Sequence, residues 1–366
     1  MLSSATLKQT PLYEEHVSLK AKIVPFGGWE MPLQYEGILA EYQDTRKNVT
    51  VFDTSHMGEF IVDGDAVKSG LDKIVTQSIS DMPLKTCRYG AMLNDQGGVM
   101  DDLIVYRLAT EKWMVVVNGG TMEKDEKQFK KLIVPGKFTN VSSKTGKLDI
   151  QGPQSRKILS SLVEDIGKLD YYTFDEFQVL GERVIVSRTG YTGELGYEIY
   201  FPWDRTKELW REVIRLGAKP AGLGVRDLLR IEMGYSLYGH ELEENISPLD
   251  AGLNKFVDWN KDFFGKDVLL RQKDQGVASA RKVACFISDT RRSPRAEQKI
   301  FAADGIEIGV VTSGTFSPSL ERGVGLGFVI KDRGAVGEKI RIGNESNKIA
   351  AEIVKRPIYT QGSLKN

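Results

Sequence analysis

The sequence predicts an α+β protein of two or three domains, the last of which is a small antiparallel β-barrel. The chain has 366 residues, which is more than one hydrophobic core usually covers. Segments with the helical spacing of apolar residues alternate with short strand-like runs up to about Gly276. Beyond that point the composition shifts to short strands punctuated by glycine turns, which is typical of a barrel.

The first predicted unit is a helix, a meander of strands and a second helix. Apolar residues follow helical spacing from Asp65 to Gln77. Strand-like runs then cover residues 88–93, 99–108 and 113–117. Thr121 can cap a second helix, whose buried stripe is Met122, Phe129, Leu132 and Ile133. The charged run between these apolar positions reads as a solvated face, and this order of elements favours a split α+β sandwich.

A second α+β unit is predicted before the barrel. One helix begins near Gly152-Pro153, and another runs from an Asp204 cap to a stop at Gly217. A hairpin between them has predicted strands at residues 183–188 and 195–201. The barrel strands are expected at residues 283–287, 306–312, 323–330 and 339–342.

The composition excludes several classes of partner. Basic and acidic residues number 50 each, so the formal net charge is zero and neither a nucleic acid nor a membrane surface is an expected partner. No apolar run approaches a membrane span, and the N-terminus lacks a signal peptide. Cys87 and Cys285 lie far apart, which argues against a disulfide framework and a zinc site. We therefore expect a cytoplasmic protein without a metal centre.

Two adjacent carboxylates, Asp101 and Asp102, interrupt a run that otherwise reads as a buried strand. The alternation of a strand gives each acid its own apolar companions, namely Val99, Leu103 and Val105 for Asp101 and Met100, Ile104 and Tyr106 for Asp102. An unpaired carboxylate in an apolar setting costs several kcal/mol or shifts its pKa. We therefore expect a partner or a chemical role for at least one acid, and we select Asp101. Alternatively, both acids are solvated at the mouth of a hairpin.

Two further segments carry charged groups suited to ligand binding. Glu194 follows a tight connection with two glycines, where a carboxylate could accept paired hydrogen bonds from a pterin-like ring edge. Alternatively, the glycines serve the turn and Glu194 is exposed. Arg226 and Arg230 share a helix face one turn apart and could hold a carboxylate-bearing ligand, with Arg226 at the end better suited to anions. Asp227 and Glu232 are the alternative partners of these arginines.

Several segments, taken together and in order, resemble the aminomethyltransferase (T-protein) family of the glycine cleavage system. The resemblance runs from end to end of the chain. Its segments are Thr10-Pro11-Leu12-Tyr13, Gly28-Trp29-Glu30-Met31-Pro32, Phe52-Asp53-Thr54-Ser55-His56-Met57, Tyr89-Gly90-Ala91-Met92-Leu93-Asn94, residues 97–105, residues 189–194, Val225-Arg226-Asp227 and residues 312–320.

The resemblance implies a three-domain cloverleaf around a central channel that holds tetrahydrofolate, with the small β-barrel as the C-terminal domain. It also implies that the first two α+β domains are discontinuous in sequence. The implied divisions are residues 1–55 with about 140–240, residues 56–139 with about 241–275 in a ferredoxin-like domain, and residues 276–366 in the barrel.

The resemblance further implies the reaction and its residues. The aminomethyl group on the lipoyl arm of H-protein gives its carbon to tetrahydrofolate, forming methylenetetrahydrofolate and ammonia. Matched motifs make Asp101 the catalytic acid and Glu194 and Arg226 folate contacts. The remaining expected contacts to the folate are Tyr89, Met57, Asn118 and Tyr359.

Two other functions stay open for the same fold. A tetrahydrofolate-dependent demethylase of a small methyl donor would share the pocket but would need no lipoylated H-protein. A non-catalytic folate-binding factor would also share the fold. That second family carries a cysteine in a Lys-Gly-Cys-Tyr motif, where this chain has Arg188-Thr189-Gly190-Tyr191. The missing thiol disfavours the binding factor.

Overall fold

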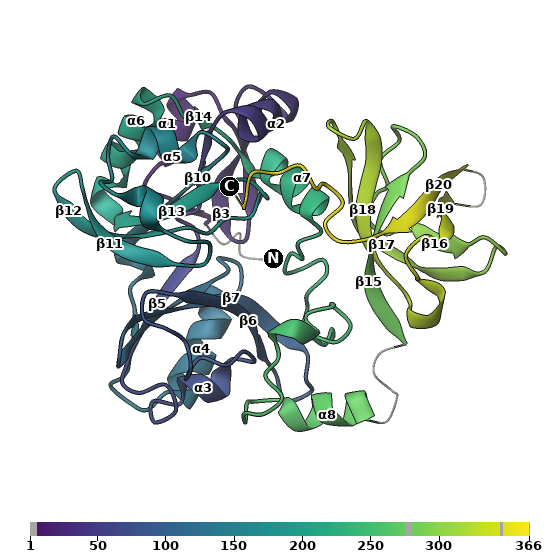
Figure 1. Ribbon diagram of the computed structural model, residues 1–366, viewed down its shortest axis with the longest axis horizontal. Helices are drawn as coiled ribbons and strands as arrows, with labels where there is room; N and C mark the ends of the chain where they lie inside the picture. Colours follow the sequence, from purple (N-terminus) through teal and green to yellow (C-terminus); the bar gives the residue numbers. More distant parts are fainter. Residues whose placement is uncertain (1–5, 275–279, 345–346, 366) are drawn as a thin grey trace.

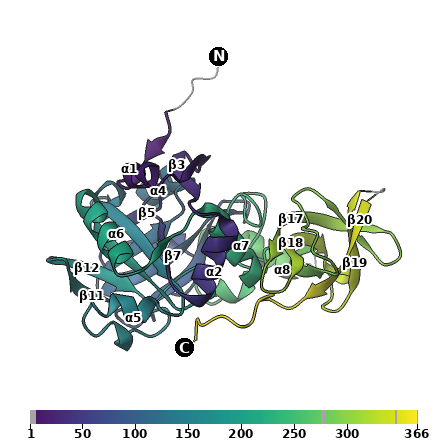
Figure 2. The same cartoon turned by 90° about the horizontal axis from the view of Figure 1, so that it is seen from above.

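The computed structural model describes residues 6–274, 280–344 and 347–365, which form three lobes. Figure 1 shows one lobe around a six-stranded sheet at the upper left, one around a five-stranded sheet below it, and a barrel at the right. Figure 2 shows the barrel standing apart from the other two lobes at one end of the molecule. The α+β class and the C-terminal barrel predicted from the sequence are confirmed.

The first lobe is built on a six-stranded sheet with the order β11-β12-β13-β10-β4-β14. Its strands are β4 (Thr50–Asp53), β10 (Thr145–Gln151), β11 (Phe174–Val179), β12 (Glu182–Ser187), β13 (Gly196–Pro202) and β14 (Lys219–Pro220). The helices around it are α1 (Tyr13–Ser18), α2 (Ile38–Lys47), α5 (Ser155–Leu159), α6 (Thr206–Arg215) and α7 (Leu223–Met233). One face of β13 enters the apolar core through Tyr197, Ile199 and Phe201.

The second lobe is inserted between β4 and β10 of the first. Its five-stranded sheet has the order β6-β7-β8-β5-β9. The strands are β5 (Gly58–Asp63), β6 (Cys87–Leu93), β7 (Val99–Ala109), β8 (Lys112–Val117) and β9 (Phe138–Asn140), and the helices are α3 (Leu71–Ile74) and α4 (Met122–Leu132). This insertion separates the parts of the first lobe in sequence. The division into residues 1–55 with about 140–240 and residues 56–139 with about 241–275 stays a prediction.

Two local predictions in this lobe were wrong. The helix expected over Asp65 to Gln77 is reduced to α3, because Gly70 takes a φ of +92° just before it and Val75 instead bridges to the sheet at Met92. A side chain at position 70 would also meet the carbonyl oxygen of Leu132. Thr121 stands at the start of α4, but its hydroxyl donates to the Asn118 carbonyl at 3.1 Å instead of capping the helix.

The barrel closes with the strand order β15-β18-β17-β16-β19-β20. Its strands are β15 (Arg281–Ser288), β16 (Lys299–Ala302), β17 (Glu307–Ser317), β18 (Arg322–Ile330), β19 (Lys339–Asn344) and β20 (Asn347–Val354). The sequence analysis missed β16, which is short, and β20. Both strands are needed for closure, because β16 and β20 each pair with β19.

Smaller elements complete the fold. A three-stranded N-terminal sheet has the order β1-β3-β2, with β1 (Lys8–Gln9), β2 (Lys22–Phe26) and β3 (Trp29–Gln34), and α8 (Lys266–Asp274) precedes the barrel. Short 3-10 helices lie at Ser142–Lys144, Ile166–Lys168, Trp203–Arg205, Asn254–Phe256 and Lys331–Arg333. Among the residues described, no helix has both the length and the apolar character needed to cross a membrane.

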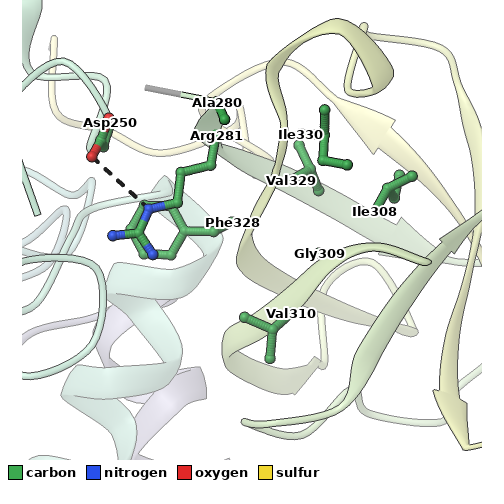
Figure 3. A pocket seen from close by; sticks show the side chains of 9 residues that line it. All are labelled: Asp250, Ala280, Arg281, Ile308, Gly309, Val310, Phe328, Val329 and Ile330. Carbon is green, nitrogen blue, oxygen red and sulfur yellow. Dashed lines mark ion pairs between the residues drawn. The ribbon is translucent and has the colours of Figure 1, made fainter. Parts of the chain in front are cut away.

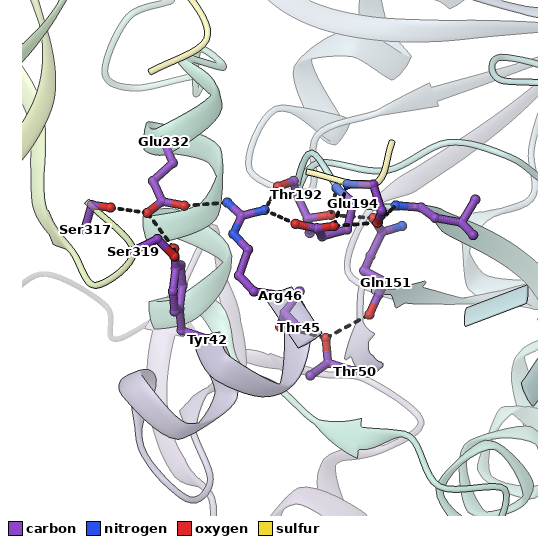
Figure 4. Close-up of polar contacts among 12 residues, drawn as sticks. Tyr42, Thr45, Arg46, Thr50, Gln151, Thr192, Glu194, Glu232, Ser317 and Ser319 are labelled. Atoms are coloured by element: carbon purple, nitrogen blue, oxygen red, sulfur yellow. Dashed lines mark hydrogen bonds and ion pairs between the residues drawn. The ribbon is translucent and has the colours of Figure 1, made fainter. Parts of the chain in front are cut away.

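A buried guanidinium joins the first lobe to the barrel. Arg46 of α2 donates to Glu194 Oε1 at 2.6 Å and to Glu232 Oε2 of α7 at 2.5 Å (Figure 4). Glu232 also accepts hydrogen bonds from the hydroxyls of Tyr42 and Ser317, and Ser317 lies at the end of barrel strand β17. A single cation therefore pairs with two buried carboxylates, one of which contacts the barrel.

The C-terminal segment returns from the barrel to the first lobe (Figure 1). The ring of Tyr359 lies 4.1 Å from the Arg46 guanidinium. The backbone N–H and the hydroxyl of Ser363 donate to Glu194 Oε2 at 2.8 and 2.5 Å. The tail is therefore held to the first lobe by charge-assisted hydrogen bonds.

Replacing Arg46 should destabilise the whole molecule. Arg46→Ala leaves two carboxylates buried without their cation, which typically costs about 3–5 kcal/mol. The free energy of unfolding, measured in urea, should fall by this amount. Arg183→Ala is the matched control, because Arg183 pairs with Glu176 on the surface and such pairs contribute at most about 1 kcal/mol. Equal losses for the two variants would contradict the role assigned to Arg46.

Candidate functional site

The two adjacent acids lie on opposite faces of the five-stranded sheet. Asp101 shares the face of Leu103 and Val105, which packs in the core beneath α3 and α4. Asp102 shares the face of Ile104 and Tyr106, which packs against Phe174 and Tyr200 of the six-stranded sheet. The predicted alternation is therefore confirmed from Asp101 onward. It fails before this point, where a β-bulge shifts the register opposite Met92 and Leu93 and Met100 packs on the core side.

One amide group holds both acids. The backbone N–H of Asn118 donates to Asp101 Oδ2 at 3.0 Å, and its side-chain Nδ2 donates to Asp101 Oδ1 at 2.9 Å and to Asp102 Oδ1 at 2.8 Å. Asn118 follows the end of β8, so it reaches the neighbouring strand β7 from the side. Because both partners are acceptors, the amide must present its N–H groups to them.

The environments of the two acids differ. Asp101 is fully buried, whereas Asp102 is partly exposed and also accepts a hydrogen bond from the Tyr89 hydroxyl at 3.0 Å. Burial raises the pKa of Asp101, and its hydrogen bonds from Asn118 oppose this rise. Burial and the nearby charge of Asp101 raise the pKa of Asp102 to about 7. Such a carboxyl can exchange a proton near neutral pH.

A third acid, Asp125 of α4, lies beside this pair. Its side chain is fully buried, and among the described residues neither of its carboxyl oxygens has a hydrogen-bond partner. Burial and the charge of Asp101 raise the pKa of Asp125 to about 10. The assignment of the charged run in α4 to a solvated face was therefore wrong at this position. The helical spacing of Met122, Asp125 and Phe129, all of them buried, is the pattern that could have revealed it.

A second polar group lies on the face of the six-stranded sheet that looks away from its apolar core. Arg226 of α7 pairs with Asp149 of β10 at 2.6 Å, and Lys147 of β10 pairs with Glu198 of β13 at 2.5 Å. The Lys147 ammonium also lies 3.4 Å from the sulfur of Met57. The sequence analysis did not select Lys147, Asp149 or Glu198, because their importance depends on cross-strand pairing between β10 and β13.

Tyr191 lies beside Arg226 of the second polar group. Its ring lies 5.1 Å from the Arg226 guanidinium. Burial raises the pKa of the Tyr191 phenol, and the negative charge of Asp102 adds to this rise while the charge of Arg226 opposes it. The Tyr191 ring therefore contacts Arg226 of the first lobe, and the charge of Asp102 in the second lobe acts on its phenol. Four of the predicted site residues lie in this region and are partly exposed, namely Met57, Tyr89, Asn118 and Arg226. Asp102 is partly exposed as well.

The other predicted residues lie elsewhere. Glu194 is 2% exposed, so the alternative that it is a solvated turn residue was wrong. It lies with Tyr359 at the Arg46 guanidinium, and Ser363 of the C-terminal tail occupies its second oxygen. Arg230 is not a companion of Arg226, because it pairs with Asp227 at 2.8 Å and with Glu241 at 2.7 Å.

A pocket of about 390 Å³ lies away from these groups, between the barrel and the segment that precedes it (Figure 3). Its lining is mostly apolar, with Val310, Phe328 and Ile330 on the barrel side and the pair of Asp250 and Arg281 at its edge. The predicted site residues Asp101, Glu194 and Arg226 do not line it. We assign no ligand to this pocket.

The Tyr89 hydroxyl should tune the acidity of Asp102. Tyr89→Phe removes a hydrogen bond that favours the ionised carboxylate, so the pKa of Asp102 should rise above about 7. Carbon-13 NMR of labelled aspartate side chains, followed against pH, measures this shift. Tyr106→Phe is the control, because the Tyr106 hydroxyl contacts Ser187 and Tyr200. An unchanged Asp102 titration in Tyr89→Phe would contradict the contact.

Comparison with known proteins identifies the family. The family described as GCVT N-terminal domain matches residues 12–261, and the glycine cleavage T-protein C-terminal barrel domain matches residues 281–360. The aminomethyltransferase of Pseudothermotoga lettingae is 43% identical, with 98% of this chain and 100% of the relative covered. That of Desulforamulus reducens is 42% identical, with 96% and 98% covered.

A solved structure agrees with these sequence relatives. The crystal structure of the glycine cleavage system aminomethyltransferase T from Bartonella henselae matches with a TM-score of 0.89 and 31% identity, covering 98% of this chain and 99% of that one. The likeness extends over all three lobes, since nearly the whole of both chains is covered. The chain therefore belongs to the glycine cleavage T-protein family.

Proposed function

We propose that this protein binds tetrahydrofolate between its lobes and transfers to it the carbon of an aminomethyl group carried by a lipoylated H-protein. As a member of the T-protein family, the chain is an aminomethyltransferase of the glycine cleavage system. The observation that carries the folate proposal is the partly exposed carboxyl of Asp102, which accepts hydrogen bonds from Asn118 and Tyr89 and whose pKa burial and the charge of Asp101 raise to about 7.

The chemistry requires positioning and charge balance. The carbon leaves a sulfur and an amine and forms bonds to two folate nitrogens, while the two protons of those nitrogens pass to the departing amine and thiol. Positive charge develops on the folate nitrogen that attacks first. A fixed carboxylate next to that nitrogen would orient it and stabilise the developing charge. A carboxyl that titrates near neutral pH could also accept the proton.

We assign the contact with the reacting centre to Asp102 and a supporting role to Asp101. The sequence analysis selected Asp101, and that residue stays part of the proposed centre. Asp101 lies on the core face and binds Asn118 through both of its oxygens. Asp102 lies on the face that looks toward the first lobe and is partly exposed. Only a carboxyl that substrate can reach can act on it directly.

The folate contacts proposed from the sequence differ in how much of each side chain is left unoccupied for a ligand. Arg226 keeps 17% of its side chain exposed and is held in place by Asp149, so it can receive an anionic or carbonyl group of the ligand. Glu194 has donors from Arg46 and two from Ser363, so about one of its four acceptor positions remains for folate. Tyr359 supports folate binding through its contact with Arg46.

We also propose a location. Cys87 and Cys285 are buried and unpaired, which suits a reducing compartment such as the cytoplasm.

One assay tests the proposed function against its alternatives. The protein is incubated with tetrahydrofolate and aminomethylated H-protein, and ammonia and methylenetetrahydrofolate are measured. Formation of both products in equal amounts supports the proposal. Turnover of a free methyl donor without H-protein would favour the demethylase, and folate binding without any turnover would favour the binding factor.

The two acids should affect turnover more than folate binding. Asp102→Asn should lower kcat by roughly 100-fold or more, because general acid-base groups contribute about that much. Asp101→Asn should also lower kcat, but less, and both should change the KM for tetrahydrofolate far less than kcat. Asp262→Asn is the control, because Asp262 is exposed and pairs only weakly with Lys73. Near-normal turnover in Asp102→Asn, with turnover lost in Asp101→Asn, would return the catalytic role to Asp101.

A further inference from the structure

Gln151 carries a buried amide that the proposed function does not yet use. It is the last residue of β10, and its side chain is fully buried. Its Nε2 donates to Asp149 Oδ1 at 2.5 Å and to the Thr189 carbonyl at 3.1 Å, and its Oε1 accepts a hydrogen bond from the Thr192 hydroxyl at 2.7 Å. Both N–H groups and the oxygen of this amide therefore have partners, which fixes its orientation.

These partners place Gln151 between two of the proposed folate contacts. On one side, Asp149 Oδ2 pairs with the Arg226 guanidinium at 2.6 Å. On the other side, the Thr192 hydroxyl accepts a hydrogen bond from the backbone N–H of Glu194 at 3.1 Å (Figure 4). A continuous chain of hydrogen bonds therefore runs from Arg226 to Glu194, and Gln151 is its central member.

Two glycines leave the space that the Gln151 amide occupies. A Cβ atom at Gly190 would lie 2.3 Å from Gln151 Nε2, and one at Gly196 would lie 2.0 Å from the same atom. Gly196 is the direct partner of Gln151 across β10 and β13. The φ of Gly190 is not positive, whereas Gly193 in the same connection has a φ of +80°. Gly190 therefore provides space for the amide, while Gly193 provides the bend.

The amide has no easy way to move aside. A glutamine side chain is flexible when it is exposed, but this one is enclosed and makes three hydrogen bonds. Moving it would leave an oxygen of Asp149 and the Thr189 carbonyl without these donors in a buried setting, which is unfavourable. The position of the amide is therefore determined by the polar groups on both sides of it.

We propose that Gln151 is a positioning residue that holds the Arg226 guanidinium and the Glu194 carboxylate at a fixed relative placement for folate. Asp149 uses one oxygen for Arg226 and the other for Gln151, so its carboxylate cannot rotate without breaking one of the two contacts. Groups that are held before the ligand arrives bind it at a lower cost in conformational entropy. This inference rests on the proposed function, because it assigns Arg226 and Glu194 to folate.

Steady-state kinetics with aminomethylated H-protein test the positioning role. Gln151→Met keeps the length of the side chain and removes the amide. The KM for tetrahydrofolate should rise about tenfold, because a hydrogen bond to the charged Asp149 is lost. The value of kcat should change less than twofold, because Asp102 lies in the second lobe and keeps its own hydrogen bonds from Asn118 and Tyr89.

Gln77→Met is the matched control for these measurements. Gln77 is also a buried glutamine beside a glycine, since a Cβ atom at Gly90 would lie 1.7 Å from its Oε1. Its amide donates to the backbone carbonyl of Arg88 at 3.3 Å. The KM for tetrahydrofolate should therefore stay unchanged in Gln77→Met. An equal KM in the two variants, or a loss confined to kcat in Gln151→Met, would overturn the positioning role.

A double-mutant cycle tests the contact between Gly190 and the amide. Gly190→Ala should raise the KM for tetrahydrofolate and lower the urea midpoint of unfolding, because the new methyl group displaces Gln151. The same substitution in a Gln151→Ala background should add little to either effect, since the obstructing amide is gone. Gly167→Ala is the control, because the nearest atom to a Cβ atom there is 3.8 Å away. Additive effects in the cycle would overturn the inference.

The two possible failures can be told apart. If the natural protein forms no methylenetetrahydrofolate from tetrahydrofolate and aminomethylated H-protein, the proposed function fails and the positioning role fails with it. If the natural protein turns over normally and the KM of folded Gln151→Met is unchanged, only the role of Gln151 fails. The urea measurements decide the contact between Gly190 and Gln151 in either case, because they need no substrate.

Discussion

The structure depends on hydrogen-bond donors and cations that compensate carboxylates, buried where the lobes meet, for their lost hydration. Removing such a group from water costs several kcal/mol unless donors replace the lost hydration. Each acid at the junction has an identified partner. Arg46 pairs with Glu194 and Glu232, Arg226 pairs with Asp149, and Lys147 pairs with Glu198. Asn118 donates hydrogen bonds to both Asp101 and Asp102. The donors therefore fix how the elements that carry these acids are placed.

These pairings tie the stability of the lobes to the geometry of the site. The Arg46 guanidinium holds the first lobe, the end of β17 and the C-terminal tail at one place, through Glu232, Ser317 and Tyr359. Glu232 lies at the end of α7, and Arg226 lies near the start of the same helix. A change in the Arg46 pairing would therefore move the helix that carries the proposed folate contact. This gives Glu194 and Tyr359 an influence on the site through structure, in addition to any direct contact with folate.

Much of the fold could be predicted from local pattern. The strands β6, β7 and β8, the helix α4 and most of the barrel were located because each carries its own periodicity and turn residues. Predictions failed where a local pattern met a tertiary constraint. The apolar spacing from residue 65 to 77 was typical of a helix, but the left-handed Gly70 and the bridge at Val75 direct that segment elsewhere. Strand β16 is only four residues long and is recognisable only from its barrel partners.

The candidate site was also predicted from the sequence only in part. The alternation of β7 established that Asp101 and Asp102 face opposite ways, and the order of motifs along the chain established the family. The sequence could not say which face looks toward the first lobe, because that depends on how β4 and β10 frame the inserted sheet. It also could not find Asp125, since a charged residue in a charged run is normally solvated.

The sequence by itself determined the class of fold, part of the order of the elements, the family and the segments that carry its acids and guanidinium groups. Tertiary structure alone decided which acid has which partner and which proton each can keep. The physical reason is distance along the chain. Arg46 and Glu194 are 148 positions apart, and Tyr42 and Glu232 are 190 apart. Burial and the donors that compensate for it belong to the folded molecule, and they set the pKa of each acid.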